Sequence, residues 1–162
     1  MDKITLSRIE TAHPAVRQAL RDIYAEICSR LTGRASCRFV EVLRSNARQA
    51  ELYAQGRSKP GRIVTNAKPG QSAHNYGLAI DICLIIDGKE ASWSTITDFD
   101  HDSIADWMEV VHVFKEHGWE WAGDWKTFRE APHFQCTFGL PIAVAQSRKE
   151  SGLVDEQGYI RI

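Results

Sequence analysis

The chain has 162 residues, of which 43% are hydrophobic and 25% charged, close to the averages for one soluble globular domain. At this length a core buries about 70% of the surface that the unfolded chain exposes, so the fold needs neither disulfides nor a metal to exist. The 20 basic and 21 acidic side chains nearly cancel, which excludes a strong general attraction to nucleic acid or to an anionic membrane. The first 81 residues hold 13 basic and 7 acidic side chains, whereas the remaining residues hold 7 basic and 14 acidic ones. We expect these two halves to face each other in one domain over residues 1–162.

The four cysteines are scattered and form no C-x-x-C pair, so we interpret them as buried thiols of a reducing compartment. They are Cys28, Cys37, Cys83 and Cys136. The first residues lack the apolar stretch of a signal peptide, and no apolar run approaches the roughly 20 residues that cross a bilayer. These features predict a protein that folds in the cytoplasm without a leader or a membrane anchor.

In the first half of the chain, apolar residues at helical spacing predict a helix over residues 14–31. A short run rich in β-forming residues predicts a strand over residues 38–43, and Ser45 then caps a predicted helix over residues 46–55. Glycine and proline among polar residues make residues 56–73 a long loop, of a length that often carries function.

In the second half, a nearly continuous apolar run predicts a buried strand over residues 78–86, and the Asp-Gly pair at 87–88 predicts a hairpin turn after it. Ser103 begins a capping-box pattern for a predicted helix that Gly118 ends. A last short strand is predicted over residues 133–137. This order of helices and strands indicates an α+β fold, with packed helices on a small, mainly antiparallel sheet.

The apolar strand contains one carboxylate, Asp81, whose burial is costly unless a cation or hydrogen-bond donors compensate it. His74 lies seven residues earlier, and His133 lies on the last predicted strand. Imidazole and carboxylate groups bind Zn²⁺ well, and three protein ligands with an open fourth position are typical of a catalytic zinc site. Glu130 lies three residues before His133, where an uncoordinated carboxylate would accept a proton from water.

Three motifs in a fixed order resemble one known family, the zinc D,D-carboxypeptidases and phage L-alanyl-D-glutamate endopeptidases that cut peptidoglycan stem peptides. The zinc signature reads Ser72-x-His74-x-x-Gly77-x-Ala79-x-Asp81, followed by Glu130-x-x-His133. The segment before it and the tryptophan motif after it read Arg44-Ser45-x-x-x-Gln49-x-x-Leu52-Tyr53-x-Gln55-Gly56-Arg57 and Trp121-Ala122-Gly123-Asp124-Trp125. The similarity covers about residues 39–138, and only an alanine at 122, where the family usually has glycine, departs from it.

The resemblance implies a Hedgehog/D,D-peptidase-like fold with the zinc site on the sheet. It implies that His74, Asp81 and His133 are the zinc ligands and that Glu130 is the general base. It further implies that Arg44 stabilises the oxyanion or anchors the substrate, a role that suits a guanidinium because it keeps its charge and binds in a fixed fork.

From this resemblance we expect a zinc peptidoglycan endopeptidase of the phage endolysin type, which hydrolyses the L-alanyl-D-glutamate bond of stem peptides. Such an enzyme accumulates in the host cytoplasm and reaches the cell wall after the membrane is breached. The stem peptide is its expected partner, the chain is expected to be a monomer, and neither nucleic acid nor membrane is expected to bind. Two alternatives stay open: a D-alanyl-D-alanine carboxypeptidase or dipeptidase, and a non-catalytic zinc-containing module that binds the cell wall.

Two other groups of residues have structural interpretations. The tryptophans of segment 119–125 are as compatible with packing as with a wall of the substrate site. Asp98-x-Asp100-x-Asp102 resembles the start of a calcium-binding EF-hand loop, but Ser103 stands where that loop has glycine. A calcium site therefore forms no part of the predicted function.

Overall fold

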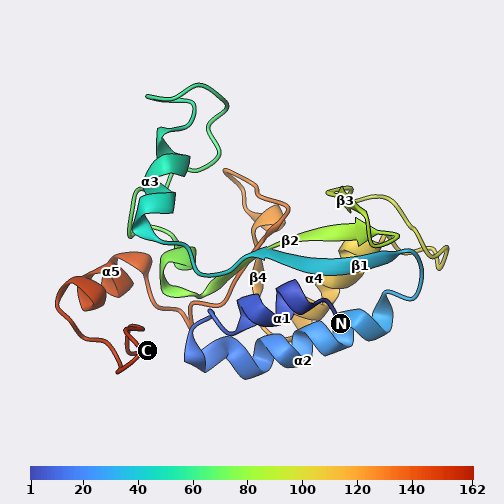
Figure 1. The fold of residues 1–162 in the computed structure, drawn as a ribbon, viewed down its shortest axis with the longest axis horizontal. Coiled ribbons are helices and arrows are strands. Elements are labelled where there is room, and N and C mark those ends of the chain that lie inside the picture. Colours follow the sequence, from blue (N-terminus) through green and yellow to red (C-terminus); the bar gives the residue numbers. More distant parts are fainter.

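The computed structural model describes residues 1–162 and contains five α-helices and a five-stranded antiparallel sheet (Figure 1). The α-helices are α1 (Lys3–Ile9), α2 (Pro14–Arg30), α3 (Asn46–Ala54), α4 (Asp106–Glu116) and α5 (Ile142–Glu150). The strands are β1 (Ala35–Glu41), β2 (Ala79–Ile86), β3 (Glu90–Ser92), β4 (Glu120–Trp121) and β5 (His133–Gln135). Two 3-10 helices, Ala73–Tyr76 and Ala122–Asp124, complete the list. The predicted α+β class with a small antiparallel sheet is confirmed.

Strand β2 is the centre of the sheet, in the order β1-β2-β5-β4, and β3 pairs with the far end of β2. Seven of its eight residues are buried, and the partly exposed one is Asp81. The register places Asp81 opposite His133 on β5 and opposite Glu41 on β1, just past an irregularity in β1. The sheet therefore brings three polar residues from distant parts of the chain into one row.

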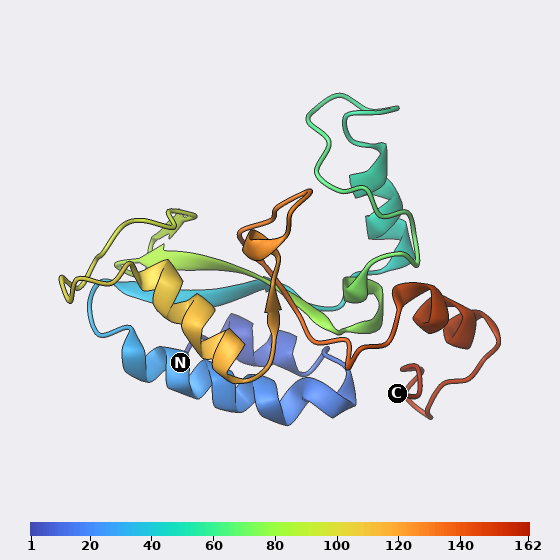
Figure 2. The ribbon, with the colours of Figure 1, turned by 180° about the vertical axis from the view of Figure 1, so that it is seen from behind.

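The helices α1, α2 and α4 cover one side of the sheet, while α3 and the loop after it rise from the other (Figures 1 and 2). The buried stripe of α2 includes Leu20, Ile23 and Ile27 at helical spacing, which is the pattern of a helix packed on a core. The ring of Phe114 on α4 stacks on Phe134 of β5 with 4.2 Å between centroids. This one-sided core leaves the opposite side of the sheet free to carry a cavity.

Several predicted elements occur within a few residues of their expected bounds. The helix predicted over 14–31 is α2, the helix capped by Ser45 is α3, and the Asp-Gly turn joins β2 to β3. Ser45 accepts a hydrogen bond from the backbone N–H of Arg48 at 3.1 Å, as a helix cap requires. Strand β1 lies three residues earlier than predicted at its start, because pairing with β2, rather than local composition, sets its limits.

Three expectations were wrong or incomplete. Ser103 does not cap α4: the helix begins at Asp106, and Ser103 has a positive φ of 80° in the loop before it. Cys28 is exposed on the outer side of α2 rather than buried, and Cys136 is only partly buried. Helices α1 and α5 were not predicted, because short helices depend mainly on tertiary packing for their stability.

Candidate active site

The candidate site forms at the end of β2 that lies between β1 and β5. Asp81 projects from β2 beside His133 of β5, and His74 comes from the 3-10 helix that precedes β2. Gly77 ends that short helix at a φ of +69°, and a Cβ there would lie 2.6 Å from the backbone nitrogen of His13. Glycine therefore allows the chain to turn sharply from His74 into β2.

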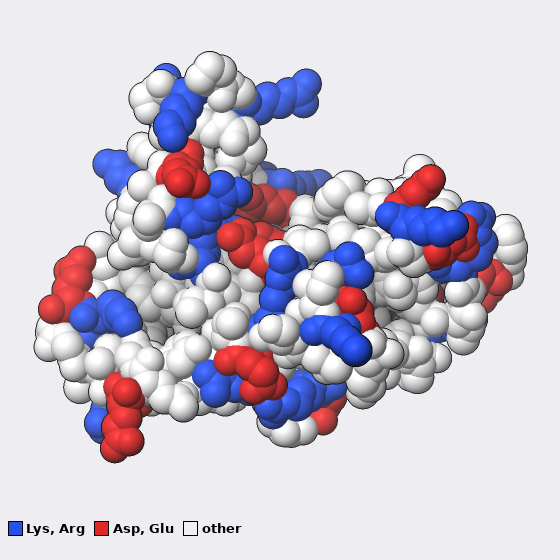
Figure 3. Space-filling view, viewed as in Figure 1, with Lys and Arg blue, Asp and Glu red and all other residues white.

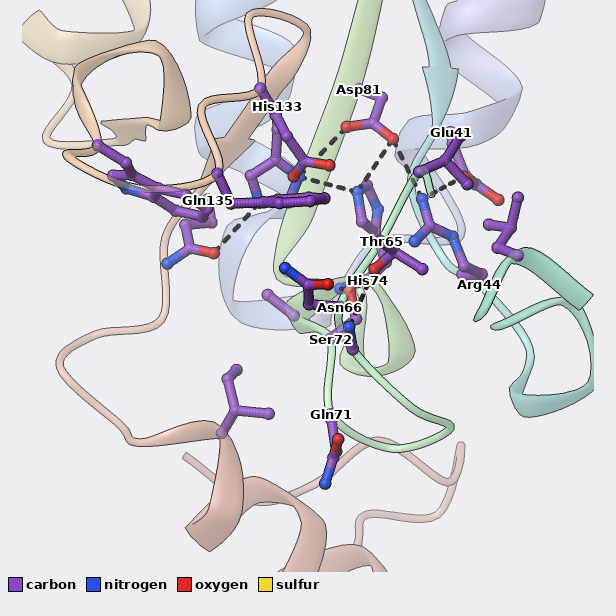
Figure 4. Close-up of a pocket in the computed structure, with 18 residues that line it drawn as sticks. Glu41, Arg44, Thr65, Asn66, Gln71, Ser72, His74, Asp81, His133 and Gln135 are labelled. Carbon is purple, nitrogen blue, oxygen red and sulfur yellow. Dashed lines mark hydrogen bonds and ion pairs between the residues drawn. The ribbon is translucent and has the colours of Figure 1, made fainter. Parts of the chain in front are cut away.

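The ligand-type atoms of three side chains converge in this corner (Figure 4). Nε2 of His74 lies 3.1 Å from Nδ1 of His133 and 3.2 Å from Oδ2 of Asp81. Nδ1 of His133 lies 3.2 Å from Oδ1 of Asp81. A tetrahedral ion with metal–nitrogen bonds of about 2.0 Å separates its ligands by about 3.3 Å, so this spacing suits a small tetrahedral metal.

The outer nitrogens of both rings have their own partners. Nδ1 of His74 lies 2.9 Å from the carbonyl oxygen of Val42, which requires an N–H there and leaves Nε2 with a lone pair. Nε2 of His133 lies 3.2 Å from Oε1 of Gln135, whose amide nitrogen donates to Glu120. With those tautomers, two lone pairs and a carboxylate point at one another, and a cation satisfies all three.

The Arg44 guanidinium lies behind Asp81, with only 8% of its side chain exposed. Its Nη2 donates to Oδ2 of Asp81 at 3.1 Å and also to Glu41, and its Nη1 donates to Oε1 of Gln49 at 3.1 Å. Burial opposes ionisation of Asp81, but the charges and hydrogen bonds that His74 and His133 supply when, without a metal, their inner nitrogens carry protons outweigh it and hold the pKa of that carboxyl well below its usual range. Asp81 is thus an ionised ligand-type group.

Glu130 lines the same cavity, just before β5. Burial raises the pKa of Glu130, and the negative charge of Asp81 acts in the same direction, against the opposing effect of His133. A carboxylate with a raised pKa accepts and returns protons more readily near neutral pH than an ordinary glutamate does.

The cavity has a volume of about 510 Å³ and opens between the loop after α3 and the segment before β5. The loop contributes Val64 to Ala67 and Gln71 to Ala73, and the opposite wall contains Trp125 and Phe128. The ring of Trp125 lies 5.5 Å from that of His133, whereas Trp119 is 4% exposed and packs in the core. Of the tryptophans for which the sequence left packing and a substrate wall both open, the structure therefore places Trp125 at the cavity and Trp119 in the core.

Basic side chains gather on α3 and the loop that overhangs the cavity, at the top left of Figure 3. Residues 46–72 contain one acidic side chain, Glu51. Their basic side chains are Arg48, Arg57, Lys59, Arg62 and Lys68. This overhang is a positively charged surface beside a site that is itself rich in carboxylates.

The structure brings all five sequence-predicted site residues to one cavity, namely Arg44, His74, Asp81, Glu130 and His133. The sequence did not single out Glu41, the second acid that Arg44 binds, or Gln135, which holds His133. Glu41 lies opposite Asp81, which only the strand register reveals. Gln135 follows His133 by two residues on β5, and the period of the predicted strand was a signal that could have placed both side chains on one face.

Comparison with known proteins agrees with this geometry. A family model described as D-alanyl-D-alanine carboxypeptidase matches residues 65–136, which include four of the five site residues. The chain is 47% identical over 95 residues to the peptidoglycan L-alanyl-D-glutamate endopeptidase CwlK of Bacillus subtilis. The predicted family resemblance is confirmed. That match covers 59% of this chain and 57% of CwlK, so the chain spans little more than half of the length of that relative.

A solved structure extends the likeness over most of the fold. The L-Ala D-Glu endopeptidase ChiX of Serratia marcescens is 26% identical and superposes with a TM-score of 0.50. The match covers 85% of this chain and 90% of ChiX. The similarity to this family of endopeptidases thus includes the core elements outside residues 65–136.

Proposed function

We propose that the protein is a zinc-dependent peptidoglycan endopeptidase that hydrolyses the L-alanyl-D-glutamate bond of stem peptides. The observation that carries the proposal is the convergence of His74, Asp81 and His133 beside an uncoordinated Glu130 in an open cavity. The names of CwlK and ChiX, both L-alanyl-D-glutamate endopeptidases, support the choice of bond.

Zinc is the metal that this donor set favours. Two imidazole nitrogens and one carboxylate match a catalytic zinc site with three protein ligands. When bound there, zinc supplies Lewis acidity that polarises a carbonyl group and lowers the pKa of water to about 7. The partners of the outer ring atoms, Val42 and Gln135, would hold the two histidines in the tautomers that bind metal.

Glu130 would act as the general base. It lines the cavity on the side of His133, and burial raises its pKa toward the range in which a carboxylate exchanges protons at working pH. It would take a proton from the attacking water and pass it to the departing amine. A non-catalytic wall-binding module has no use for such a carboxylate, so its placement favours the enzyme over that alternative.

Arg44 would act chiefly by positioning Asp81. Its two terminal nitrogens are already bonded to Asp81, Glu41 and Gln49, and its Nε is buried without a partner. A guanidinium committed to three protein groups has little freedom to reach an oxyanion. The contacts therefore favour a role in holding Asp81 over the oxyanion-stabilising or substrate-anchoring role that the family resemblance implied.

The substrate class fits the charge around the cavity. Stem peptides carry free carboxylates, and the segment 46–72, which also contributes part of the cavity wall, carries five cationic side chains. Trp125 and Phe128 offer an apolar wall for alanyl groups. Phage lysis, action after membrane breach and a monomeric state are further proposals that rest on the sequence resemblance. No helix has the length and apolar character to cross a bilayer.

Mass spectrometry of muropeptides tests the proposal. Purified zinc-loaded protein should release peptides that begin with D-glutamate and leave L-alanine on the muramic acid, while Glu130→Gln under the same conditions should release none above background. Release of terminal D-alanine alone would replace the proposal with the D-alanyl-D-alanine carboxypeptidase activity that the family model names. No cleavage of any wall peptide by the zinc-loaded protein would refute enzymatic function.

A further inference from the structure

A second cluster of possible metal ligands lies far from the cavity, in the loop between β3 and α4 and in the first turn of α4. Figure 1 shows this loop at the end of the sheet opposite to α3. Two groups of three carboxylates there have their oxygens within 4.8 Å of one another, and they share Asp100. The five acidic residues are Asp98, Asp100, Asp102, Asp106 and Glu109.

Buried oxygens in this cluster have no hydrogen-bond partner. Asp106 is 0% exposed and its Oδ1 is unpaired, and Glu109 is 6% exposed and its Oε2 is unpaired. Oδ1 of Asp100 is also buried without a partner. An uncompensated buried carboxylate is costly, so a cation bound among these three oxygens would remove a substantial energetic cost.

The remaining oxygens of these carboxylates fix the shape of the loop. Oδ2 of Asp106 accepts from the backbone of Phe99 at 2.7 Å, and Oδ2 of Asp100 accepts from the hydroxyl of Thr32 at 2.9 Å. Asp98 accepts from the backbone of Ser103 at 2.9 Å. Asp98 is anchored through both oxygens, since its Oδ1 also accepts from the backbone of His101, whereas Asp100 and Asp106 are each anchored by one oxygen and their Oδ1 is left free.

The spacing is that of an EF-hand loop, whose twelve residues supply side-chain ligands from positions 1, 3, 5, 9 and 12. Counted from Asp98, those positions hold the five acidic residues, and α4 follows as the exiting helix. Position 12 is Glu109, the residue that the EF-hand loop requires there, so Ser103 at the glycine position is the departure from the pattern. Ser103 adopts a φ of +80°, the backbone conformation for which that position normally uses glycine.

We propose that residues 98–109 form a Ca²⁺ site that fastens the loop to α4 and to the turn after α2. The two groups of ligands contain carboxylate oxygens alone, and His101 of the same loop belongs to neither group, so the donor set suits calcium rather than zinc. The turn after α2 packs closely on the site, since a Cβ at Gly33 would lie 2.4 Å from Cβ of Asp100. Calcium bound there would stabilise this end of the fold, independently of the reaction at the cavity.

Calorimetry and thermal unfolding of the zinc-loaded protein, freed of calcium on a chelating resin, test this site. Titration with CaCl₂ should show one site per chain, and Ca²⁺ one hundredfold above its Kd should raise Tm by roughly 5–10 °C. The variant Asp106→Asn/Glu109→Gln should lose both signals and should be more stable than the wild type without calcium, because repulsion among the carboxylates falls. Glu116→Gln, which removes a charge from the exposed end of α4, should respond to calcium as the wild type does.

Three results would overturn the proposal. They are no heat and no Tm shift up to about 10 mM CaCl₂, an equal Tm shift with Mg²⁺ at the same concentration, or calcium binding by the double variant with unchanged affinity. If the double variant does not fold, Glu109→Gln alone must weaken calcium binding at least tenfold. None of these readouts depends on peptidoglycan hydrolysis, so failure of one proposal leaves the other intact.

Discussion

Carboxylates cluster at both ends of the sheet, but the groups that surround them differ. At the cavity, Asp81 is surrounded by groups that favour its charge: Arg44 donates to it, and His74 and His133 lie against it. In the 98–109 segment, four of the five acidic side chains accept hydrogen bonds from backbone or hydroxyl groups, and none of the five forms an ion pair with Lys or Arg. One site is therefore largely organised by protein contacts, while the other needs a cation from solution.

The comparison teaches that ligand chemistry and local charge together select a metal. Mixed nitrogen and oxygen donors with a neutralising arginine suit a tightly bound ion that performs chemistry. A cluster of five carboxylates with no basic partner suits a hard, exchangeable ion that performs a structural task. Variants that change one end should leave the properties of the other unaltered.

The largest effect is expected from removing a ligand at the cavity. His74→Ala, Asp81→Ala and His133→Ala should each lose zinc and reduce peptide release to the level without enzyme, because two remaining ligands hold zinc poorly. The fold should persist, since a core of this size does not depend on metal alone. Metal analysis per chain beside muropeptide release checks both, and unchanged zinc in all three variants would refute the site.

Glu130→Gln is expected to show whether Glu130 acts as a general base or as a zinc ligand. Glutamine keeps the size of the side chain but cannot accept a proton at neutral pH, so activity should fall by about 10²- to 10⁴-fold with zinc content unchanged. Because Glu130 must be ionised to act and its pKa is raised, wild-type activity should increase with pH above the usual glutamate range. A variant that loses zinc as His133→Ala does would show that Glu130 is a ligand instead.

Arg44→Lys should have an intermediate effect, about 10- to 100-fold on metal affinity or activity. An ammonium cannot bridge Asp81, Glu41 and Gln49 together, so the ligand would lose its fixed orientation. Zinc titration and kinetics separate the roles: weakened zinc binding supports positioning, whereas normal zinc binding with a reduced kcat supports direct contact with the oxyanion.

The acidic loop should make stability depend on pH in the absence of calcium. Burial, with repulsion from Asp102, Asp100 and Asp106 and a weak opposing effect of Arg30, raises the pKa of Glu109 to about 7. A raised folded-state pKa means that the protonated form stabilises the fold below the unfolded pKa, so Tm should fall by a few degrees as pH rises through 7. In a Tm series from pH 5.5 to 8, saturating calcium or Glu109→Gln should each reduce the dependence of Tm on pH. An unchanged dependence in Glu109→Gln would show that the ionisation of Glu109 does not cause it.

Ser103→Gly should have the smallest effect. Glycine relieves the cost of a positive φ but increases the entropy of the unfolded chain, so we expect a net gain of about 0.5–1 kcal/mol. Urea unfolding measures it, with Ser147→Gly in the helix α5 as a control that should destabilise by a similar amount. A loss of stability at Ser103 would indicate that its hydroxyl has a role that the backbone does not show.

Much of the candidate site was accessible from the sequence, because the signals are local. One carboxylate in an apolar strand, a histidine seven residues before it and the Glu130-x-x-His133 pair were enough to predict the metal group and the base. The predictions of α2, α3 and β2 succeeded for the same reason, since each shows its own periodicity and its own end signals.

Only the tertiary structure decided which other residues contact the predicted site residues. Glu41 and His133 lie opposite Asp81 only because β1 and β5 pair with β2 in one particular register. The unpaired oxygens of Asp106 and Glu109 likewise result from packing α4 against the loop, which removes water from carboxylates that look solvated in the sequence. Composition and spacing along the chain determine which side chains are available. Strand register and burial determine which of these side chains meet and at what energetic cost. Register and burial depend on contacts between residues far apart in sequence, so neither can be predicted from a local pattern.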